Sequence, residues 1–218
     1  MKLIINGTIL NNLHLTGLGV YTHNLVQHLL PLINRTGRFD DIVLIGAEDR
    51  CRLLLGSVIN EFDVTVAHAP AEEPVRRLWE IHRAVAQHST PGSTLVYSTT
   101  HHGVTRGRVR QVITIHDLFA RLFPDNYPSQ SKYFNYVLPW VLRKTDRVIV
   151  DSESTATDFR TYYGQSPPSM VIHAGLRGDL VNARPERIPA LDKQPFFLFV
   201  GPSYAYKNAD RVIAAFAS

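Results

Sequence analysis

The chain has 218 residues, of which 44% are hydrophobic and 19% are charged, and these are ordinary values for a globular protein. Its formal net charge is only +4, and the basic residues are scattered, so nucleic acid is disfavoured as a partner. An anionic small molecule or a lipid headgroup fits this mild basicity better. The single cysteine, Cys51, excludes an intramolecular disulfide framework.

The start of the chain favours a cytoplasmic protein. Residues 1–7 lack the basic start and the long apolar stretch of a signal peptide. No apolar stretch approaches the roughly 18 residues of a membrane-spanning helix. Peripheral contact with the inner face of a membrane is compatible with both observations.

Short apolar runs recur along the chain and predict strands. Most of them are continuous rather than alternating, which is typical of strands buried on both faces of a parallel sheet. The runs are residues 2–7, 41–46, 62–68, 94–99, 111–117, 146–152, 169–175 and 196–201.

Three segments between these runs carry apolar residues three or four positions apart, which predicts helices that pack one stripe against a sheet. The stripes are Leu18, Tyr21, Leu25, Leu29 and Leu32; Val75, Leu78, Trp79, His82 and Val85; and Tyr133, Phe134, Val137, Leu138 and Val141. Strand and helix patterns alternate from Lys2 to about Gly175. This order predicts an α/β fold with a doubly wound, mostly parallel, Rossmann-like sheet.

The second predicted helix carries three arginines beside its tryptophan. We expect Arg76, Arg77 and Arg83 to form a solvated face while Trp79 is buried. Contact of this basic face with anionic lipid is the alternative interpretation.

The pattern changes near the end of the chain. The segment from Leu176 to Pro195 has three prolines, several charges and no sustained period, as in a linker. An apolar run then ends at Gly201, and an apolar-periodic segment begins at Asn208, which predicts one strand, a loop and a helix. We expect a Rossmann-like domain over 1–185, a linker over 186–195 and the start of a truncated second domain over 196–218.

The loop after the first run contains Gly17 and Gly19, directly before an amphipathic segment. Backbone amides at the start of that helix can meet an anion with no side chain in the way. The loop lacks the G-x-G-x-x-G spacing of a dinucleotide fingerprint, so a Rossmann dehydrogenase is disfavoured. Helix-start geometry without a ligand is the alternative.

In an open α/β sheet, ligands bind outside the carboxyl ends of the strands. His116 and Asp117 end the fifth run, where a histidine can donate to a sugar hydroxyl or phosphate and a carboxylate can accept from a hydroxyl. Structural roles for this pair are the alternative.

Other polar residues follow neighbouring runs and are candidates for the rim of the same cleft. They are Thr99, His101, His102 and Ser152. For the two histidines the alternative is exposed loop positions without a function. Lys207 lies just before the last helical segment, where its ammonium can meet a diphosphate, although an ordinary exposed loop lysine fits as well.

Other chemistries lack their motifs. The chain has no H-E-x-x-H, no C-x-x-C and no G-x-S-x-G, so we expect no metal and no cofactor, and a nucleophile-elbow hydrolase is disfavoured.

Four stretches taken together resemble glycosyltransferase family 4. They are "TGLGVYTHNLVQHLL", "VITIHDLFARLFPDNYP", "DRVIVDSESTATDF" and "FFLFVGPSYAYKNADRVIAAF". Members of this family are retaining enzymes of the GT-B fold, in which two Rossmann-like domains face each other across a cleft. The resemblance implies that the first domain is the acceptor-side domain and that 196–218 begins the donor-binding domain.

The same resemblance implies roles for single residues. The loop of Gly17 and Gly19 would face the donor diphosphate, His116 would contact the donor sugar, and Lys207 would contact the donor phosphates. The sequence departs from the family's pattern in three places. Ala174 stands where the family usually has an asparagine, and Lys207 lacks the arginine that often precedes this lysine in the family. The family's paired-glutamate motif would lie beyond Ser218.

The implied activity is transfer of a sugar, with retention, from a nucleotide-sugar to a saccharide or a lipid-linked acceptor. We expect the chain to be a fragment that is inactive alone. One alternative is a non-catalytic half-enzyme or interaction module that pairs with a separate donor-domain chain or associates with itself through the apolar run at Phe196. Another is a sugar-nucleotide enzyme of the same architecture, such as an epimerase. The sequence does not name the donor sugar, the base or the acceptor.

Overall fold

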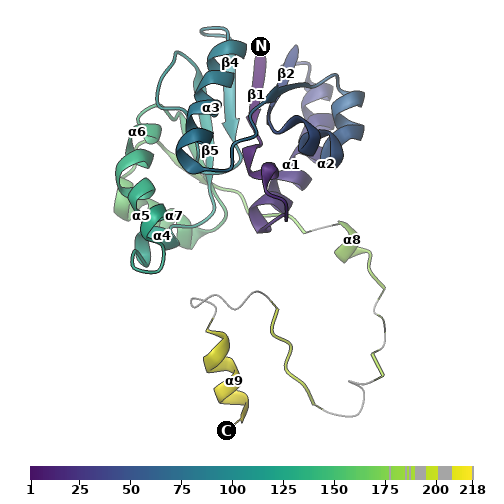
Figure 1. Ribbon diagram of the computed structural model, residues 1–218, viewed down its shortest axis with the longest axis vertical. Coiled ribbons are helices and arrows are strands. Elements are labelled where there is room, and N and C mark those ends of the chain that lie inside the picture. Colours follow the sequence, from purple (N-terminus) through teal and green to yellow (C-terminus); the bar gives the residue numbers. More distant parts are fainter. Residues whose placement is uncertain (177, 185, 187, 190–194, 201–207, 218) are drawn as a thin grey trace. The chain divides into compact units, whose positions relative to one another are not determined.

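The computed structural model describes the chain apart from residues 177, 185, 187, 190–194, 201–207 and 218 (Figure 1). The chain divides into two compact units, Met1–Gly175 and Leu176–Ser218. The division falls where the alternation of strand and helix patterns ends.

The first unit contains a seven-stranded sheet in which all strands are parallel, in the order β3-β2-β1-β4-β5-β6-β7. The strands are β1 (Lys2–Asn6), β2 (Asp41–Gly46), β3 (Thr65–His68), β4 (Thr94–Ser98), β5 (Arg110–Ile115), β6 (Arg147–Val150) and β7 (Ser169–Val171). The predicted Rossmann-like α/β class is therefore confirmed, and the first seven apolar runs each contain a strand.

The chain reverses its winding direction at β1. From β1 it passes outward to β2 and β3, and then it returns to place β4 on the other side of β1, with Leu3 opposite Ile42 of β2 and Leu95 of β4. The strands from β4 to β7 continue outward from there. Such a reversal opens a crevice at the carboxyl ends of the two central strands, here β1 and β4.

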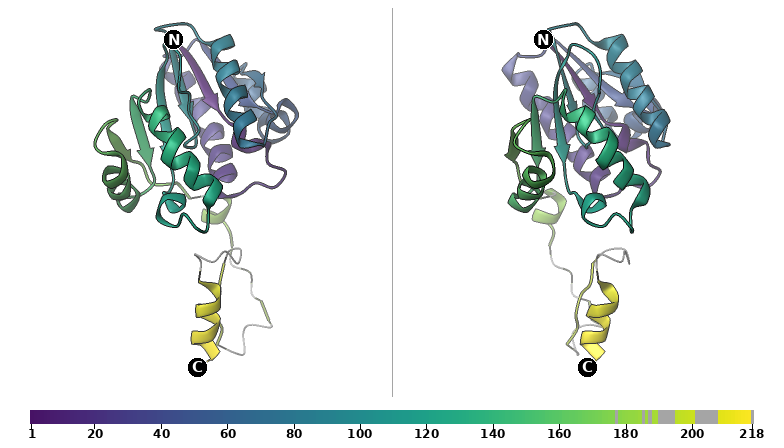
Figure 2. Two further views of the ribbon diagram at one scale, coloured as in Figure 1. Left: turned by 60° about the vertical axis from the view of Figure 1, so that its left-hand side comes forward. Right: turned by 90° about the vertical axis from the view of Figure 1, so that its left-hand side faces the viewer.

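Helices cover both faces of this sheet (Figures 1 and 2). Helices α1 (Gly17–Thr36) and α2 (Glu48–Glu61) pack on one face, where Leu3, Leu44 and Tyr97 belong to their core cluster. Helix α3 (Pro74–His88), the π-helical turn η2 (Tyr133–Val137) and α6 (Leu138–Leu142) pack on the other face. The remaining elements of this unit are η1 (Thr8–Asn11), α4 (Phe119–Leu122), α5 (Pro128–Lys132) and α7 (Glu153–Tyr163).

Helix α1 forms where it was predicted, but its buried stripe is rotated. Thr22, Val26 and Leu30 are buried at its centre, while Leu25 and Leu29 are partly buried at its flank. The predicted stripe residue Leu32 is 57% exposed. Packing against both the sheet and α2 turns the helix, because α1 must cover two surfaces at once.

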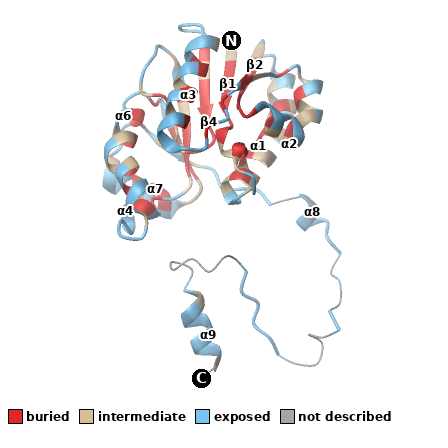
Figure 3. Ribbon diagram, in the orientation of Figure 1, coloured by how far each residue is buried: buried red, intermediate tan, exposed pale blue. Residues whose placement is uncertain are grey.

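Helix α3 overturns the predicted stripe almost completely. Its buried residues are Arg77, Glu80, Ile81, Ala84 and Val85. Val75 is 76% exposed and Trp79 is 59% exposed, so the prediction of a buried tryptophan is wrong, and Arg77 is buried rather than solvated. Figure 3 shows both buried and exposed parts along α3.

Two charged side chains explain this orientation of α3. Glu80 accepts a hydrogen bond from the Ala71 amide at 2.8 Å, and Arg77 donates to the carbonyls of Ala71 at 3.3 Å and Glu72 at 2.8 Å. Both side chains have partners in the turn before the helix, so their burial is not heavily penalised. They fix α3 with the stripe of Ile81 and Ala84 against the sheet.

The third predicted helix is interrupted. Phe134, Leu138 and Val141 are buried as predicted, but a π-helical turn separates α5 from α6. Pro139 has no amide hydrogen to donate to the preceding turn, which accounts for a local change in hydrogen bonding there.

The second unit contains the short helices α8 (Gly178–Val181) and α9 (Ala209–Ala217). The strand predicted at the eighth apolar run is wrong, since Phe196–Val200 has no strand structure. A parallel strand requires hydrogen bonds to neighbouring strands, and the described residues of this unit provide none. Phe197, Leu198 and Val200 are more than three quarters exposed, at 78%, 78% and 77%.

Candidate functional site

Polar side chains meet at the crevice between the carboxyl ends of β1 and β4. Thr99, directly after β4, donates its hydroxyl proton to the Asn6 carbonyl at 3.1 Å and accepts from the Thr22 hydroxyl of α1 at 2.9 Å. Thr99 is fully buried. It therefore joins two strand ends to a helix and lies beneath the predicted rim of the cleft.

Asn6 closes the same crevice from β1. Its amide group donates to the His102 carbonyl at 2.7 Å and to the Ser98 hydroxyl at 3.3 Å, and its carbonyl oxygen accepts from the amide and hydroxyl of Thr8. Asn6 is only 2% exposed. This one side chain therefore holds the ends of β1 and β4 in register with the loop that follows.

His116, at the end of β5, lies between two acceptors. Its Nε2 donates to the Thr99 carbonyl at 2.9 Å, and its Nδ1 faces Asp151 Oδ2 at 2.6 Å. The Thr99 carbonyl and the Asp151 carboxylate thus hold the imidazole ring from both of its nitrogens. The orientation of the ring at the carboxyl edge of the sheet is therefore determined within the protein.

Asp151 follows β6 and has two different oxygens. Oδ2 pairs with His116, whereas Oδ1 is buried without a hydrogen-bond partner among the described residues. Burial first, and then the nearby Tyr21 and Asp151, raise the pKa of the Tyr97 phenol, whose hydroxyl is 3.1 Å from Thr114 Oγ1. A buried phenol and a carboxylate oxygen without a described partner therefore lie close to His116.

The start of α1 lies beside this histidine. Tyr21 presents its ring edge-on to His116, with 4.6 Å between ring centroids, and it lies one turn after Gly17. The N-cap residue Thr16 makes no side-chain cap, and no acidic residue occupies the first turn. The first amides of a long helix, with their partial positive charge, are therefore left for a ligand or solvent.

The two glycines of this turn differ. A Cβ on Gly17 would meet no other atom of the chain within 4 Å, whereas a Cβ on Gly19 would lie 2.8 Å from the Leu15 side chain. Gly19 is therefore required by packing within the protein. Gly17 leaves an open approach to the backbone, which is the property expected where an anion binds.

The paired histidines after β4 are packed, and the alternative of exposed loop histidines is wrong. The His101 ring contacts His102, Tyr133 and Phe134, with centroid distances of 4.2, 5.3 and 4.7 Å. Burial lowers the pKa of His102 to about 3 and lowers that of His101 well below its ordinary value. Both rings are therefore neutral at pH 7 and form an aromatic wall next to Asn6.

The remaining predicted residues have local partners. Asp117 is exposed, and its carboxylate accepts from the Phe119 amide at 3.1 Å at the start of α4. Ser152 caps α7 by accepting from the Thr155 amide at 3.1 Å. Lys207 lies outside the described residues. The functional roles predicted for all of these residues stay predictions.

The predicted strand ends included Asn6 and Asp151, because each directly follows an apolar run, but sequence reasoning gave neither residue a role. It missed Thr22 altogether. Thr22 had no signal, because a threonine inside an amphipathic helix is not distinguished by its spacing. Among the described residues, no group of three histidine, cysteine, aspartate or glutamate side chains is arranged to hold a metal ion.

A separate groove of about 690 Å³ runs along the outer surface of α3 and shares no residue with the His116 cluster. In the part of the chain that the structure describes, no helix is both long enough and apolar enough to cross a membrane.

The parallel sheet and the reversal of winding at β1 define a doubly wound α/β protein with a Rossmann-like sheet. The sequence profile of Glycosyltransferase Family 4 matches residues 69–177, and the chain belongs to this family. No curated protein and no solved structure matches the chain. The matched residues include Thr99, His116 and Ser152 but not Gly17, Gly19 or Lys207, and membership implies a transferase that uses a sugar donor and an acceptor.

Proposed function

We propose that the chain supplies the acceptor-side half of a retaining glycosyltransferase that transfers a sugar from a nucleotide-sugar to a saccharide or lipid-linked acceptor. The observation that carries this proposal is the uncapped start of α1, whose Tyr21 ring lies 4.6 Å from the His116 ring at the same edge of the sheet. The partial positive charge of these helix amides suits a ligand that carries a diphosphate.

In this proposal the residues divide the work as follows. The amides at Gly17 and Gly19 bind the donor diphosphate and stabilise the charge that develops on it as the sugar leaves. His116 orients the sugar, and Asp117 accepts from a hydroxyl. Asp151 is a positioning residue, because its carboxylate holds the His116 ring through the 2.6 Å contact. Lys207 binds the donor phosphates.

Retention agrees with the chemistry of this edge. The acceptor hydroxyl attacks the anomeric carbon on the face that the phosphate leaves, and the departing phosphate oxygen removes the proton. No strong protein base is then required. We place the reaction in the cytoplasm, with a domain over 1–185, a linker over 186–195 and the beginning of the donor-binding part over 196–218.

Gly17→Ala tests the diphosphate site directly. A methyl group at this position meets nothing in the protein, so the fold is kept and only the approach of a ligand is obstructed. Titration of nucleoside diphosphates and nucleotide-sugars, followed by amide NMR, is expected to shift the signals of residues 17–19. The variant is expected to weaken this binding about tenfold, as the loss of about 1.4 kcal/mol of binding free energy would do.

Gly56→Ala is the matched control, because Gly56 in α2 also has open space around its Cβ position. Equal affinity in Gly17→Ala and Gly56→Ala, or ligand-induced shifts confined to another surface, would contradict the proposed site.

Asp151→Asn tests the positioning role with a spectroscopic readout. Imidazole ¹⁵N signals of His116 are expected to differ between the wild type and the variant, because an amide replaces the carboxylate that contacts Nδ1 at 2.6 Å. Identical ¹⁵N signals in both proteins would contradict the proposal that Asp151 positions the His116 ring.

Transfer itself is tested in a protein that joins this chain to a complete donor-binding domain, because the chain alone is expected to be inactive. Nucleotide-sugars are supplied with mixed saccharide and lipid-linked acceptors, and the anomeric configuration of the product is read by NMR. His116→Ala is expected to lower transfer about a hundredfold, as misplacement of a reacting group does. An inverted product, or unchanged transfer by His116→Ala, would refute the retaining mechanism or the role of His116 respectively.

A second candidate function is favoured by the exposed apolar run of the second unit. Phe197, Leu198 and Val200 are each at least 77% exposed, and exposed apolar patches of this kind mark interfaces. In this alternative the chain is an interaction module that pairs with a donor-domain chain or with itself. Light scattering that shows a monomer without concentration dependence would count against self-association.

A further inference from the structure

Both tryptophans of the chain lie on the surface. Trp79 of α3 and Trp140 of α6 are each 59% exposed, and they are the only two in the sequence. Each ring has an arginine in a cation–π contact. The Arg83 guanidinium lies 5.1 Å from the Trp79 ring centroid, and the Arg143 guanidinium lies 4.6 Å from the Trp140 ring centroid. Exposure of large aromatic rings with basic partners marks a binding surface rather than a packing defect.

The two tryptophans belong to one side of the protein. Helices α3 and α6 cover the same face of the sheet, and the connection between β4 and β5 crosses that face between them. Its Gly103 passes so close to α6 that a Cβ would lie 2.7 Å from Val141, and its Thr105 amide donates to His82 Nε2 of α3 at 2.9 Å. We call the outer surfaces of α3, residues 103–109 and η2 with α6 the tryptophan face (Figure 1).

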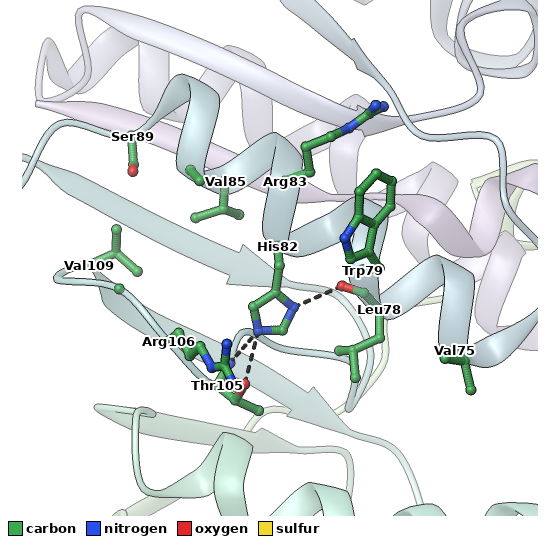
Figure 4. Close-up of a pocket in the computed structure, with 12 residues that line it drawn as sticks. Val75, Leu78, Trp79, His82, Arg83, Val85, Ser89, Thr105, Arg106 and Val109 are labelled. Carbon is green, nitrogen blue, oxygen red and sulfur yellow. Dashed lines mark hydrogen bonds between the residues drawn. The ribbon is translucent and has the colours of Figure 1, made fainter.

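An apolar groove lies within this face because the connection from β4 to β5 contains no helix. The groove holds about 690 Å³ beside α3, and Figure 4 shows Trp79 and Arg83 on the helix side and Thr105 with Arg106 on the loop side. Val75 and Leu78 extend its apolar lining.

The charge of the chain is concentrated on the same side. Residues 72–110 and 128–147 contain ten of the 23 basic residues but only four of the 19 acidic residues, Glu72, Glu73, Glu80 and Asp146. Glu80 is buried, and Asp146 accepts from the Gln111 amide at 2.7 Å. The exposed basic residues of these segments include Arg76, Arg83, Arg106, Arg108, Arg143 and Lys144. The rest of the chain has a slight acidic excess, so the net positive charge of the protein lies in these segments.

These observations limit the occupant. A second copy docked through the same face would place like charges opposite each other, which is unfavourable. A single-stranded nucleic acid would stack its bases on open aromatic ring faces, but arginines already lie over these rings. A bilayer interface suits rings with apolar bodies and polar edges, and lipid phosphates suit arginines whose stems lie on apolar surface.

We propose that the tryptophan face binds the surface of a bilayer that contains anionic phospholipids. The exposed arginines contact lipid phosphates, while Trp79, Trp140 and Val75 enter the interface region and the groove receives apolar chain segments. The proposal is independent of the sugar-transfer site, which lies at the carboxyl edge of the sheet.

The tryptophans themselves report on this binding, since no other tryptophan contributes to the fluorescence. Vesicles of phosphatidylcholine mixed with phosphatidylglycerol are expected to shift the emission to shorter wavelength and to sediment with the protein. Vesicles of phosphatidylcholine alone are expected to do neither, and added salt is expected to weaken the binding.

Paired charge variants supply the matched comparison. Arg83→Gln with Arg106→Gln removes two charges from the tryptophan face, and Arg35→Gln with Arg38→Gln removes two exposed charges at the end of α1. The first pair is expected to lower vesicle affinity roughly thirtyfold, because each arginine near an anionic surface contributes about 1 kcal/mol. The second pair is expected to change it less than threefold, since these charges lie farther than a Debye length from the bilayer.

Variants of apolar residues distinguish insertion of side chains into the bilayer from electrostatic attraction to its surface. Trp79→Ala is expected to weaken vesicle binding and to remove part of the emission shift, whereas Leu53→Ala on α2, where the leucine is 73% exposed, is expected to do neither. Equal losses in the two charge pairs, equal binding to neutral vesicles, or a fluorescence response to single-stranded RNA without one to vesicles would each overturn the proposal.

Discussion

The carboxyl edge of the sheet and the tryptophan face use polar and apolar side chains in opposite ways. At the edge, polar groups such as Asn6, Thr99 and His116 are withdrawn from solvent and bonded to one another across four strand ends. On the tryptophan face, Trp79 and Trp140 remain in solvent with arginines beside them.

The difference separates two kinds of functional surface. A site that must orient a small ligand requires side chains whose positions are already determined, and a buried hydrogen-bond network provides this. A surface that meets a fluid partner such as a bilayer requires exposed apolar area and mobile charged groups instead. Substitutions should therefore affect stability at the edge and association at the face.

Loss of Asn6 should have the largest effect on stability. Asn6→Ala leaves the His102 carbonyl and the Thr8 groups without their buried partner and is expected to lower the free energy of unfolding by about 3 kcal/mol. Asn60→Ala, at an exposed position of α2, is expected to change it by less than about 0.5 kcal/mol. Urea denaturation measures both, and similar values would show that the edge network is not a stabilising unit.

The junction between the two regions is tested at Gly103. A methyl group there would lie 2.7 Å from Val141 and 2.8 Å from Gln111 Oε1, so Gly103→Ala is expected to destabilise the protein by about 2 kcal/mol. The same change at Gly56, with open space around it inside α2, is expected to stabilise by about 0.5 to 1 kcal/mol. Thermal unfolding that ranks the two variants in the other order would mean that the β4–β5 connection moves away freely.

Acid should lower the stability of the fold, because His101 and His102 at the carboxyl edge of the sheet are buried as neutral rings. Burial lowers the pKa of His102 to about 3, so the unfolded chain takes up a proton below about pH 6.5 that the folded chain refuses until about pH 3. Stability is therefore expected to fall as the pH drops from 6.5 to 3, with His101 acting in the same direction. His102→Gln should reduce this slope, whereas His14→Gln, at an exposed position, should leave it unchanged when unfolding is followed across this range.

The smallest stability effect is expected on the tryptophan face. Trp79→Ala removes a ring that is 59% exposed and is expected to change the free energy of unfolding by less than about 0.5 kcal/mol in urea. A loss as large as that of Asn6→Ala would mean that the ring stabilises the fold and would erase the contrast between the regions.

Much of the fold followed from local pattern. The continuous apolar runs predicted seven of the observed strands, and residues at their ends, such as His116 and Thr99, proved to be neighbours in space. The eighth run, at Phe196, shows the limit of this reasoning, because a parallel strand depends on hydrogen bonds from other strands and not on its own composition.

The site was predictable in position but not in detail. Parallel strands end at one edge, so the amino-acid sequence alone placed candidate residues there. It did not reveal that His116 is held between Thr99 and Asp151, because such partners come from strands distant in the chain. For the same reason it did not reveal that Thr22 of α1 belongs to the cluster.

The sequence by itself determined the α/β class, the parallel strands and the edge at which polar groups gather, since these depend on residue type and spacing along one segment. Only the tertiary structure decided which stripe of α3 faces the sheet. Arg77 and Glu80 can be buried there because their side chains form hydrogen bonds with the backbone of the preceding turn. That choice sends Trp79 outward, and hydrophobic period alone does not distinguish a core stripe from a binding surface.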